Sequence, residues 1–297
     1  MKGDAAKFAL HRKICEFCGT PFTIWRERMK CMGEKRKGGG NQIAIVTGAS
    51  SGLGREFIRQ IAARYPGLDE IWAVARRRER LEELKESYPN ICPVCADLLT
   101  VSGRDLLRKK LETEQPGVRL LVLGAGCGHY GLLETQKEEA LAEMIALNDE
   151  ALTRVLAMAL PHIPEKSRIL AIASSAAYLP QPGFAVYAAT KAYVRHLCLA
   201  LGQELKKRRV TVTAVCPGPV KTEFFERAGQ TIAPWKQRFL NEPAPVVEKA
   251  LKDADRGRAE SVYGISMKAV RIGAKCLPWN PLIRIMGKFA EERRTKR

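Results

Sequence analysis

The chain has few acidic residues for its length and no long apolar run. Its 297 residues contain 32 Asp and Glu against 50 Lys and Arg, a formal net charge of +18 at pH 7. No apolar stretch approaches the ~20 residues that cross a bilayer, and the first residues lack the apolar core of a secretory signal. We therefore expect a cytoplasmic protein. The positive balance favours an anionic partner: a phosphorylated cofactor, a nucleic acid or an acidic membrane surface.

Cysteine is also sparse. Nine cysteines in 297 residues are too few for a disulfide scaffold, and without a secretory signal we expect reduced thiols. Cys92 and Cys95 form a C-x-x-C, but they lie in an apolar run. That context is typical of a buried strand rather than of a redox loop that opens a helix.

Residues 1–40 differ in kind from the rest of the chain. They carry ten Lys and Arg against four Asp and Glu and end in a basic, glycine-rich stretch. Cys15 and Cys18 could present two thiolates to one zinc ion, with Cys31 and His11 as further ligands, but the second C-x-x-C of a zinc ribbon is missing. We expect a basic, flexible N-terminal extension with free thiols and no bound metal.

From residue 42 onward, short apolar runs alternate with segments of helical periodicity. The runs are mostly continuous, as in strands buried on both faces. They cover residues 43–46, 71–75, 91–95, 120–123, 168–173 and 210–215. This alternation predicts an α/β fold, namely a doubly wound, mostly parallel sheet of the Rossmann type, as a single domain over residues 41–265. A basic amphipathic tail over residues 266–297 follows it.

A glycine-rich turn follows the first run. Gly48 can make the tight turn, Gly52 lets backbone approach a pyrophosphate, and Gly54 permits close helix packing. The N-terminus of the helix that follows faces the anion. The order of strand, turn and helix predicts a dinucleotide site formed by Gly48, Ser50, Ser51, Gly52, Leu53 and Gly54.

The second run is followed by Arg76, Arg77 and Arg78, where an NAD-binding protein usually has an acidic residue. Arg76 can hold a 2′-phosphate in a planar, charge-assisted fork, with Arg77 and the Ser50 hydroxyl adding contacts. Arg78 and Arg80 fit a solvated helix start better. The sequence therefore predicts NADP(H) as the cofactor.

A tyrosine and a lysine stand four residues apart in Tyr187-Ala188-Ala189-Thr190-Lys191. A helix would point both into the same cleft. Ser174 stands thirteen positions before the tyrosine, at the end of the fifth run. Each alone has an ordinary structural explanation, such as an amphipathic helix pair or a strand-ending serine. The combination predicts an acid–base site.

With this spacing and its G-x-x-x-G-x-G turn, the chain resembles the short-chain dehydrogenase/reductase family over residues 42–264, in the non-extended, NADP(H)-preferring branch. The resemblance implies hydride transfer between NADP(H) and a carbonyl or secondary alcohol. It assigns the acid–base role to Tyr187. Lys191, together with the positive ring of the oxidised nicotinamide, would lower the pKa of that phenol, and Lys191 would also bind the nicotinamide ribose hydroxyls. The resemblance gives Ser174 the stabilisation of the substrate oxygen, and Asn148 the fixing of a water as a proton relay.

The resemblance implies further cofactor contacts. Asp97 and Leu98 match a pair that meets the adenine, and a Pro-Gly turn after the sixth run matches one beside the nicotinamide, formed by Pro217, Gly218, Val220 and Thr222. After the fourth run the chain departs from the family, with Leu-Gly-Ala-Gly in place of Asn-Asn-Ala-Gly. Ala125 and Gly126 still let backbone pass close to the cofactor ribose, but the hydrogen bonds of the asparagines are lost.

The substrate side is less specific. Residues 223–245 suit a substrate lid, although their aromatics would equally pack the edge of the domain; these are Phe224, Phe225, Trp235 and Phe239. His129 and Tyr130 either line the substrate mouth or lie on the surface.

The tail places Leu282, Ile285, Met286 and Phe289 on one helical face. That face would cover the cleft, pack on another subunit or lie on an acidic membrane surface, in that order of preference. The expected partners are a small carbonyl or alcohol substrate and further copies in a homodimer or homotetramer, with peripheral membrane contact through the tail as an open alternative. No specific nucleic acid is expected.

Two functions remain open. One is an NADP(H)-dependent oxidoreductase. The other is a catalytically weak NADP(H)-binding sensor or scaffold on the same fold, since a fold does not determine a function. The complete set of Ser174, Tyr187, Lys191 and Asn148 favours the enzyme, because a sensor has no need of a polarised phenol.

Overall fold

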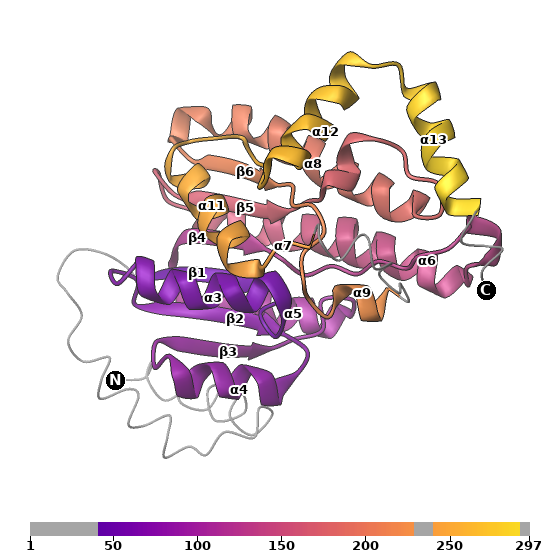
Figure 1. The fold of residues 1–297 in the computed structure, drawn as a ribbon. Helices are drawn as coiled ribbons and strands as arrows, with labels where there is room; N and C mark the ends of the chain where they lie inside the picture. Colours follow the sequence, from indigo (N-terminus) through magenta and orange to yellow (C-terminus); the bar gives the residue numbers. More distant parts are fainter. Residues whose placement is uncertain (1–40, 229–239, 292–297) are drawn as a thin grey trace, which may run out of the picture. The chain divides into compact units, whose positions relative to one another are not determined.

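The structure is a computed structural model that describes residues 41–228 and 240–291. They form a parallel sheet of seven strands in the order β3-β2-β1-β4-β5-β6-β7, with helices on both faces (Figure 1). The expected doubly wound α/β fold is confirmed. The extension over residues 1–40, with its candidate zinc ligands, lies outside the described residues.

Six strands coincide with the apolar runs of the sequence. They are β1 (Gln42–Thr47), β2 (Glu70–Ala75), β3 (Ile91–Cys95), β4 (Gly117–Leu123), β5 (Arg168–Ile172) and β6 (Thr211–Val215). Cys92 and Cys95 lie on β3, as expected. The sequence did not predict the edge strand β7 (Glu260–Ser261), which pairs with the end of β6. It is two residues long and has no apolar run.

Helices pack on both faces of the sheet (Figure 1). One face carries α3 (Gly52–Arg64), α4 (Arg78–Ser87) and α11 (Pro243–Asp255), and the other carries α5 (Val101–Glu114), α7 (Leu152–Ala159) and α8 (Ala185–Glu204). A further helix, α6 (Glu138–Ile145), continues into α7 through a π-helical turn, Ala146–Ala151.

The central strand β1 is buried on both sides. Its side chains alternate between two apolar cores: Ile43 and Ile45 belong to one, Ala44 and Val46 to the other. A strand covered on both faces has no solvent side, which is why its sequence is continuously apolar.

The order of the strands creates a crevice. From β1 the chain moves outward to β2 and β3, then returns to β4 on the opposite side of β1. Crossovers that leave the carboxyl ends of β1 and β4 in opposite directions open a space between them, and ligands of doubly wound sheets bind there. The turns that hold the predicted site residues all lie at this edge.

Beyond the sheet the chain forms two helices, α12 (Ile265–Cys276) and α13 (Trp279–Glu291), drawn in gold and yellow in Figure 1. Of the helices in the described ranges, none combines the length and the apolar character needed to cross a bilayer.

Candidate active site

A cavity of about 870 Å³ lies at the carboxyl edge of the sheet. Nearly every predicted site residue lines it; the exception is Asn148. The lining residues are Gly48, Ser50, Ser51, Gly52, Leu53, Gly54, Arg76, Arg77, Asp97, Leu98, Ala125, Gly126, Ser174, Tyr187, Lys191, Pro217, Gly218, Val220 and Thr222. The turns after six strands thus meet around one space.

The turn after β1 has no room for side chains at two of its glycines. Gly48 has φ +69°, in the left-handed region that favours glycine. A Cβ on Gly54 would lie 2.2 Å from the Gly48 carbonyl oxygen, so β1 and α3 could not pack this closely with any other residue. The first turn of α3 lines the cavity. The N–H groups of a first helical turn have no partner within the helix, which suits an anion.

Thr47 supports the loop in which the chain departs from the Asn-Asn-Ala-Gly pattern. Its hydroxyl accepts hydrogen bonds from the backbone N–H groups of Gly124 (3.0 Å) and Ala125 (3.1 Å). These bonds tie β1 to β4 at the crevice. They offset part of the hydrogen bonding that the missing asparagines would supply.

A carboxylate sits within a basic cluster at the end of β2. Arg77 donates to the Ser50 hydroxyl from Nε (3.1 Å) and Nη2 (2.8 Å), and to Glu223 from Nη1 (3.1 Å). Arg80 and Arg227 also donate to Glu223. Hydrogen bonding, first of all from Arg80, holds the pKa of Glu223 below its usual range. Ser50, Arg77, Arg80 and Glu223 therefore form one connected group beside the cavity.

Arg76 and Arg80 have different surroundings, and only those of Arg80 differ from expectation. Arg76, expected to grip a phosphate, is exposed at the rim of the cavity. Arg80, expected to be a solvated helix residue, is half-buried and bound to Glu223 and to the Ser50 carbonyl. Sequence spacing could not reveal this pairing, because Arg80 and Glu223 are 143 residues apart.

Asp97 organises the turn after β3. Its Oδ1 accepts from the Leu99 N–H at 3.0 Å, and its carbonyl oxygen accepts from the Thr100 hydroxyl at 2.9 Å. Asp97 and Leu98 also line the cavity. The aspartate therefore has a structural role whatever it binds.

Tyr187 and Lys191 lie one turn apart on α8, 7% and 5% exposed. Lys191 Nζ donates to the Ile172 carbonyl at the end of β5 (2.9 Å) and lies 5.7 Å from the centroid of the Tyr187 ring. Two residues beyond Ile172, the Ser174 hydroxyl accepts from the Ala176 N–H at 3.1 Å. A phenol, a hydroxyl and an ammonium are thus brought to one end of the cavity.

Burial has the largest effect on the pKa values of Tyr187 and Lys191. It raises the pKa of Tyr187 to about 12, and a hydrogen bond with Ser174 acts in the opposite direction. Burial also lowers the pKa of Lys191 to about 8. Burial therefore sets the pKa of the phenol above its usual value, because excluding water from the phenolate outweighs the hydrogen bond that favours it. The lowering that the resemblance implies also depends on the positive ring of the oxidised nicotinamide, and it stays a prediction.

Asn148 lies in the π-helical turn and is fully buried. Its Nδ2 donates to the Cys127 carbonyl (2.9 Å) and to Thr190 Oγ1 (3.0 Å), and its Oδ1 accepts from the Cys127 N–H (2.9 Å). These contacts fix the loop after β4 against α8, one residue before Lys191. The geometry gives the Asn148 side chain a positioning role, and its part in a proton relay stays a prediction.

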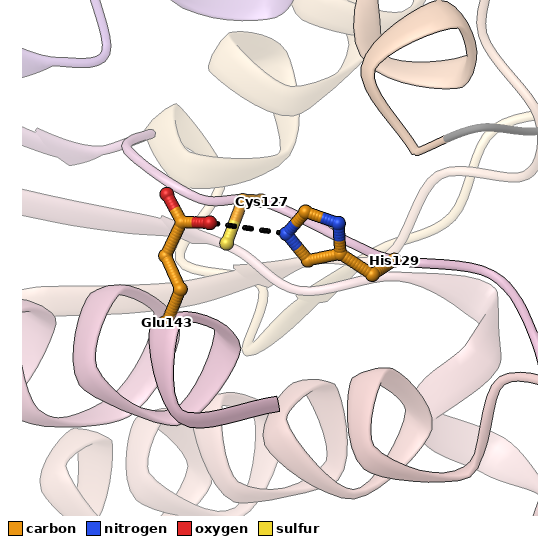
Figure 2. Close-up of side chains that lie close together, drawn as sticks. All are labelled: Cys127, His129 and Glu143. Carbon is orange, nitrogen blue, oxygen red and sulfur yellow. Dashed lines mark hydrogen bonds and ion pairs between the residues drawn. The ribbon is translucent and has the colours of Figure 1, made fainter. Parts of the chain in front are cut away.

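Three side chains with metal-ligating atoms meet at the loop after β4 (Figure 2). Those of Cys127, His129 and Glu143 lie within 4.8 Å of one another, and His129 Nε2 is 3.1 Å from Glu143. Of these three residues, the sequence analysis considered only His129. Glu143 lies 14 residues further on, in α6, so no local spacing connects the two. Burial, followed by the nearby charge of Glu143, raises the pKa of the Cys127 thiol to about 12, against the smaller effects of Lys191 and Arg76. The thiolate is the form that binds metals, and here it is disfavoured, so we assign no metal to these three side chains.

Aromatic rings form the wall beside Tyr187. Phe184 stacks on it with ring centroids 4.1 Å apart, and Phe224 lies 5.4 Å away at a tilt. Tyr130 packs against Phe184 at 5.5 Å. Tyr130 and Phe224 thus line the cavity, which was one of the two alternatives open for each of them from the sequence. The sequence did not predict Phe184, because no recognisable pattern precedes the tyrosine motif. Trp235 and Phe239 lie outside the described residues.

The turn after β6 closes the cavity from the side of α12. The Pro217 carbonyl accepts from the Ser175 N–H at 2.8 Å, which ties this turn to the end of β5. A Cβ on Gly218 would lie 2.7 Å from the Met267 sulfur. Met267, together with Met286 of α13, adds a further apolar wall.

Comparison with known proteins agrees with this geometry. The model of the short-chain dehydrogenase family matches residues 42–233. The chain therefore belongs to that family of oxidoreductases.

Individual relatives are similar over most of their length. An uncharacterized oxidoreductase of Myxococcus xanthus is 30% identical over 81% of this chain and 94% of its own. An NADP-dependent 3-hydroxy acid dehydrogenase of Salmonella typhi is 32% identical over 64% and 80%. A solved short-chain dehydrogenase from Sphingobium yanoikuyae, in complex with NADPH, superposes with a TM-score of 0.66 at 26% identity, over 80% of this chain and 96% of that one.

Proposed function

We propose that this oxidoreductase uses NADP(H) to interconvert a carbonyl compound and a secondary alcohol. The observation that carries the proposal is that Ser174, Tyr187 and Lys191 line the same cavity as the glycine turn. A proton donor, a hydrogen-bond donor and a cation then surround the place where a carbonyl oxygen gains charge.

The described residues fit NADP(H). Gly52, with φ +52° at the start of α3, presents backbone without a side chain to the cavity, as a pyrophosphate site requires. The Ser50 hydroxyl and the guanidinium groups of Arg76 and Arg77 offer charge-assisted hydrogen bonds to a 2′-phosphate. The NADP-dependent and NADPH-bound relatives support the same choice.

When bound, the nicotinamide supplies or accepts the hydride. The Tyr187 hydroxyl gives a proton to the oxygen of the carbonyl being reduced, or takes one from the alcohol in the reverse direction. Ser174 donates a hydrogen bond to that oxygen as charge develops on it. Lys191 holds the ribose hydroxyls with the donors it does not use on Ile172, and its ammonium favours the phenolate form of Tyr187.

The cavity walls indicate an apolar substrate. Phe184 and Phe224 pack against Tyr187, and Met267 and Met286 also line the cavity. Burial of an apolar substituent against these side chains would supply binding energy of about 25 cal/mol per Å². A ketone with a bulky hydrocarbon substituent fits this cavity better than a charged one.

The test is Tyr187→Phe, which removes only the hydroxyl. NADPH binding, followed by fluorescence titration, should survive, while single-turnover oxidation of NADPH with an accepted ketone should fall by ~10²–10⁴-fold. Tyr193→Phe is the matched control, because Tyr193 also lies on α8 but is 42% exposed and pairs with Thr153. Full turnover in Tyr187→Phe would remove the acid–base assignment. A wild-type chain that binds NADPH but reduces no carbonyl would favour the binding-only alternative.

A further inference from the structure

Exposed apolar side chains gather on the two C-terminal helices. Of nine large apolar side chains that are exposed in the described part of the chain, five lie between residues 265 and 279. They are Ile265, Val270, Ile272, Leu277 and Trp279. Ile265 and Ile272 are 85% and 62% exposed and stand seven residues apart, two turns of α12, so they share one face. Such a concentration of exposed apolar area marks an interaction site.

The corner between α12 and α13 carries the bulkiest of these side chains. Trp279 Nε1 donates to the Ala274 carbonyl at the end of α12 (3.1 Å). Its ring is thereby held in place while half of it stays exposed, next to the exposed Leu277. An indole with a satisfied N–H and an open apolar face suits the boundary between water and lipid.

The charge of the same segment has one sign. Residues 261–290 contain five Lys and Arg and no Asp or Glu. Lys268 and Lys275 are exposed on α12, beside Ile272. Arg271 is bound to Glu260 at 2.7 Å and thus helps to hold the helix on the edge of the sheet. The exposed face is therefore apolar and cationic together.

We propose that the docking face, defined as Ile265, Lys268, Ile272, Lys275, Leu277 and Trp279, binds the surface of an anionic phospholipid bilayer. An apolar stripe flanked by cations is the pattern of helices that lie in the membrane interface. Two copies of this chain joined through the same face would bring like charges together. A nucleic acid would satisfy the lysines but would leave the isoleucines and the leucine in water.

The docking face adjoins the cavity. Met267 and Val270 of α12 and Met286 of α13 line the cavity, while other residues of the same helices form the docking face. A bilayer bound there would lie against the wall of the site. An apolar ketone dissolved in lipid would then have a short path into it. The docking proposal itself does not depend on the proposed reaction.

The test is sedimentation of the full-length protein with large vesicles. Phosphatidylcholine vesicles that also contain phosphatidylglycerol should bind the protein, and added salt should weaken the binding because it screens the lysines. Vesicles of phosphatidylcholine alone should bind much less. The triple variant Ile265→Ser/Ile272→Ser/Leu277→Ser should bind anionic vesicles at least about tenfold more weakly, because it removes the apolar part of the face.

Matched controls separate this face from general effects. Val101→Ser/Leu133→Ser/Ile145→Ser removes three exposed apolar side chains elsewhere, each at least 52% exposed, and should bind like the wild type. Lys268→Glu/Lys275→Glu should lose binding, whereas Lys109→Glu/Lys207→Glu, with the same change of charge at exposed sites elsewhere, should retain most of it.

Three outcomes would overturn the proposal. If the triple variant binds vesicles as well as the wild type does, another basic segment, such as residues 1–40, makes the contact. Equal binding to both vesicle types would remove the role of charge. Wild-type protein that binds no vesicles but forms a dimer that the triple variant lacks, seen by light scattering, would make this face a contact between copies. Circular dichroism of each variant establishes that it is folded. Its affinity for NADPH should be unchanged, because the substituted side chains do not line the cavity.

Discussion

Arg77 Nη1 donates a hydrogen bond of 3.1 Å to Glu223 Oε2, and the same guanidinium also donates to the Ser50 hydroxyl. A carboxylate therefore occupies the basic cluster that we propose for the 2′-phosphate of NADP(H). Two anions at one cluster compete, and this competition can be measured.

Glu223→Gln should tighten NADPH binding several-fold, because the variant removes a negative charge from the proposed phosphate site and frees Arg77 and Arg80. NADH binding should change little. Glu226→Gln, an exposed neighbour three residues on, is the control. Titration of the wild type and of each variant with both cofactors gives the six dissociation constants needed. If Glu223→Gln instead weakens NADH and leaves NADPH unchanged, the carboxylate serves the ribose hydroxyls of NAD.

Arg76→Ala and Arg77→Ala separate the two proposed phosphate contacts. Each should weaken NADPH binding far more than NADH binding, by about 1.5–3 kcal/mol for a charge-assisted hydrogen bond. The loss should be larger for Arg77, since it is already oriented by Ser50. Arg78→Ala, an exposed residue at the start of α4, should leave both affinities near the wild-type values. A wild-type preference for NADH would refute the assignment of both arginines.

The affinity for NADPH should fall as the pH rises above about 8. Burial lowers the pKa of Lys191 to about 8, so its ammonium, proposed to hold the ribose, loses its proton over that range. Lys191 is fully charged well below this pKa and loses its charge as the pH rises through it. A hydrogen bond from the charged ammonium to the ribose contributes about 1.5–3 kcal/mol to binding. Titrations from pH 6.5 to 9.5, in ~0.5 unit steps, would follow this inflection. Lys191→Met should bind weakly throughout with no inflection near pH 8, and a flat wild-type profile would contradict the assignment.

Asp149→Asn should raise the melting temperature at pH 8. Burial raises the pKa of Asp149 from 3.8 to about 6, against the pull of Lys191, and its Oδ1 has no hydrogen-bond partner among the described residues. The folded form holds the proton more tightly than the unfolded one, so the ionised carboxylate destabilises the fold above pH 6. The gain in the variant should shrink as the pH falls through 6 and vanish below about 4. Glu112→Gln, at an exposed carboxylate, should show no such trend in thermal melts.

The fold was predictable because buried parallel strands leave a strong signal. β1 packs on two cores at once, which forces a continuous apolar run between turns. The edge strand β7 left none, since two residues paired on one side need no apolar pattern.

The centre of the site was predictable for a different reason. A helix places Tyr187 and Lys191 on one face by its own geometry, and the motif places Ser174 at the end of the neighbouring strand. What surrounds them depends on contacts distant in sequence. Glu223 meets Arg77 across 146 residues, and Asn148 meets Thr190 across 42. No local pattern encodes either pairing.

Glu223 and Phe224 are neighbours in the chain but belong to different ends of the site. The carboxylate of Glu223 rests on the basic cluster, while the ring of Phe224 rests 5.4 Å from that of Tyr187. A single peptide unit joins them, so a phosphate that displaced the carboxylate would also shift one wall of the proposed substrate space. Such a linkage would make the enzyme follow a compulsory order, in which the dinucleotide enters first and the ketone binds to a site that the dinucleotide has already reshaped.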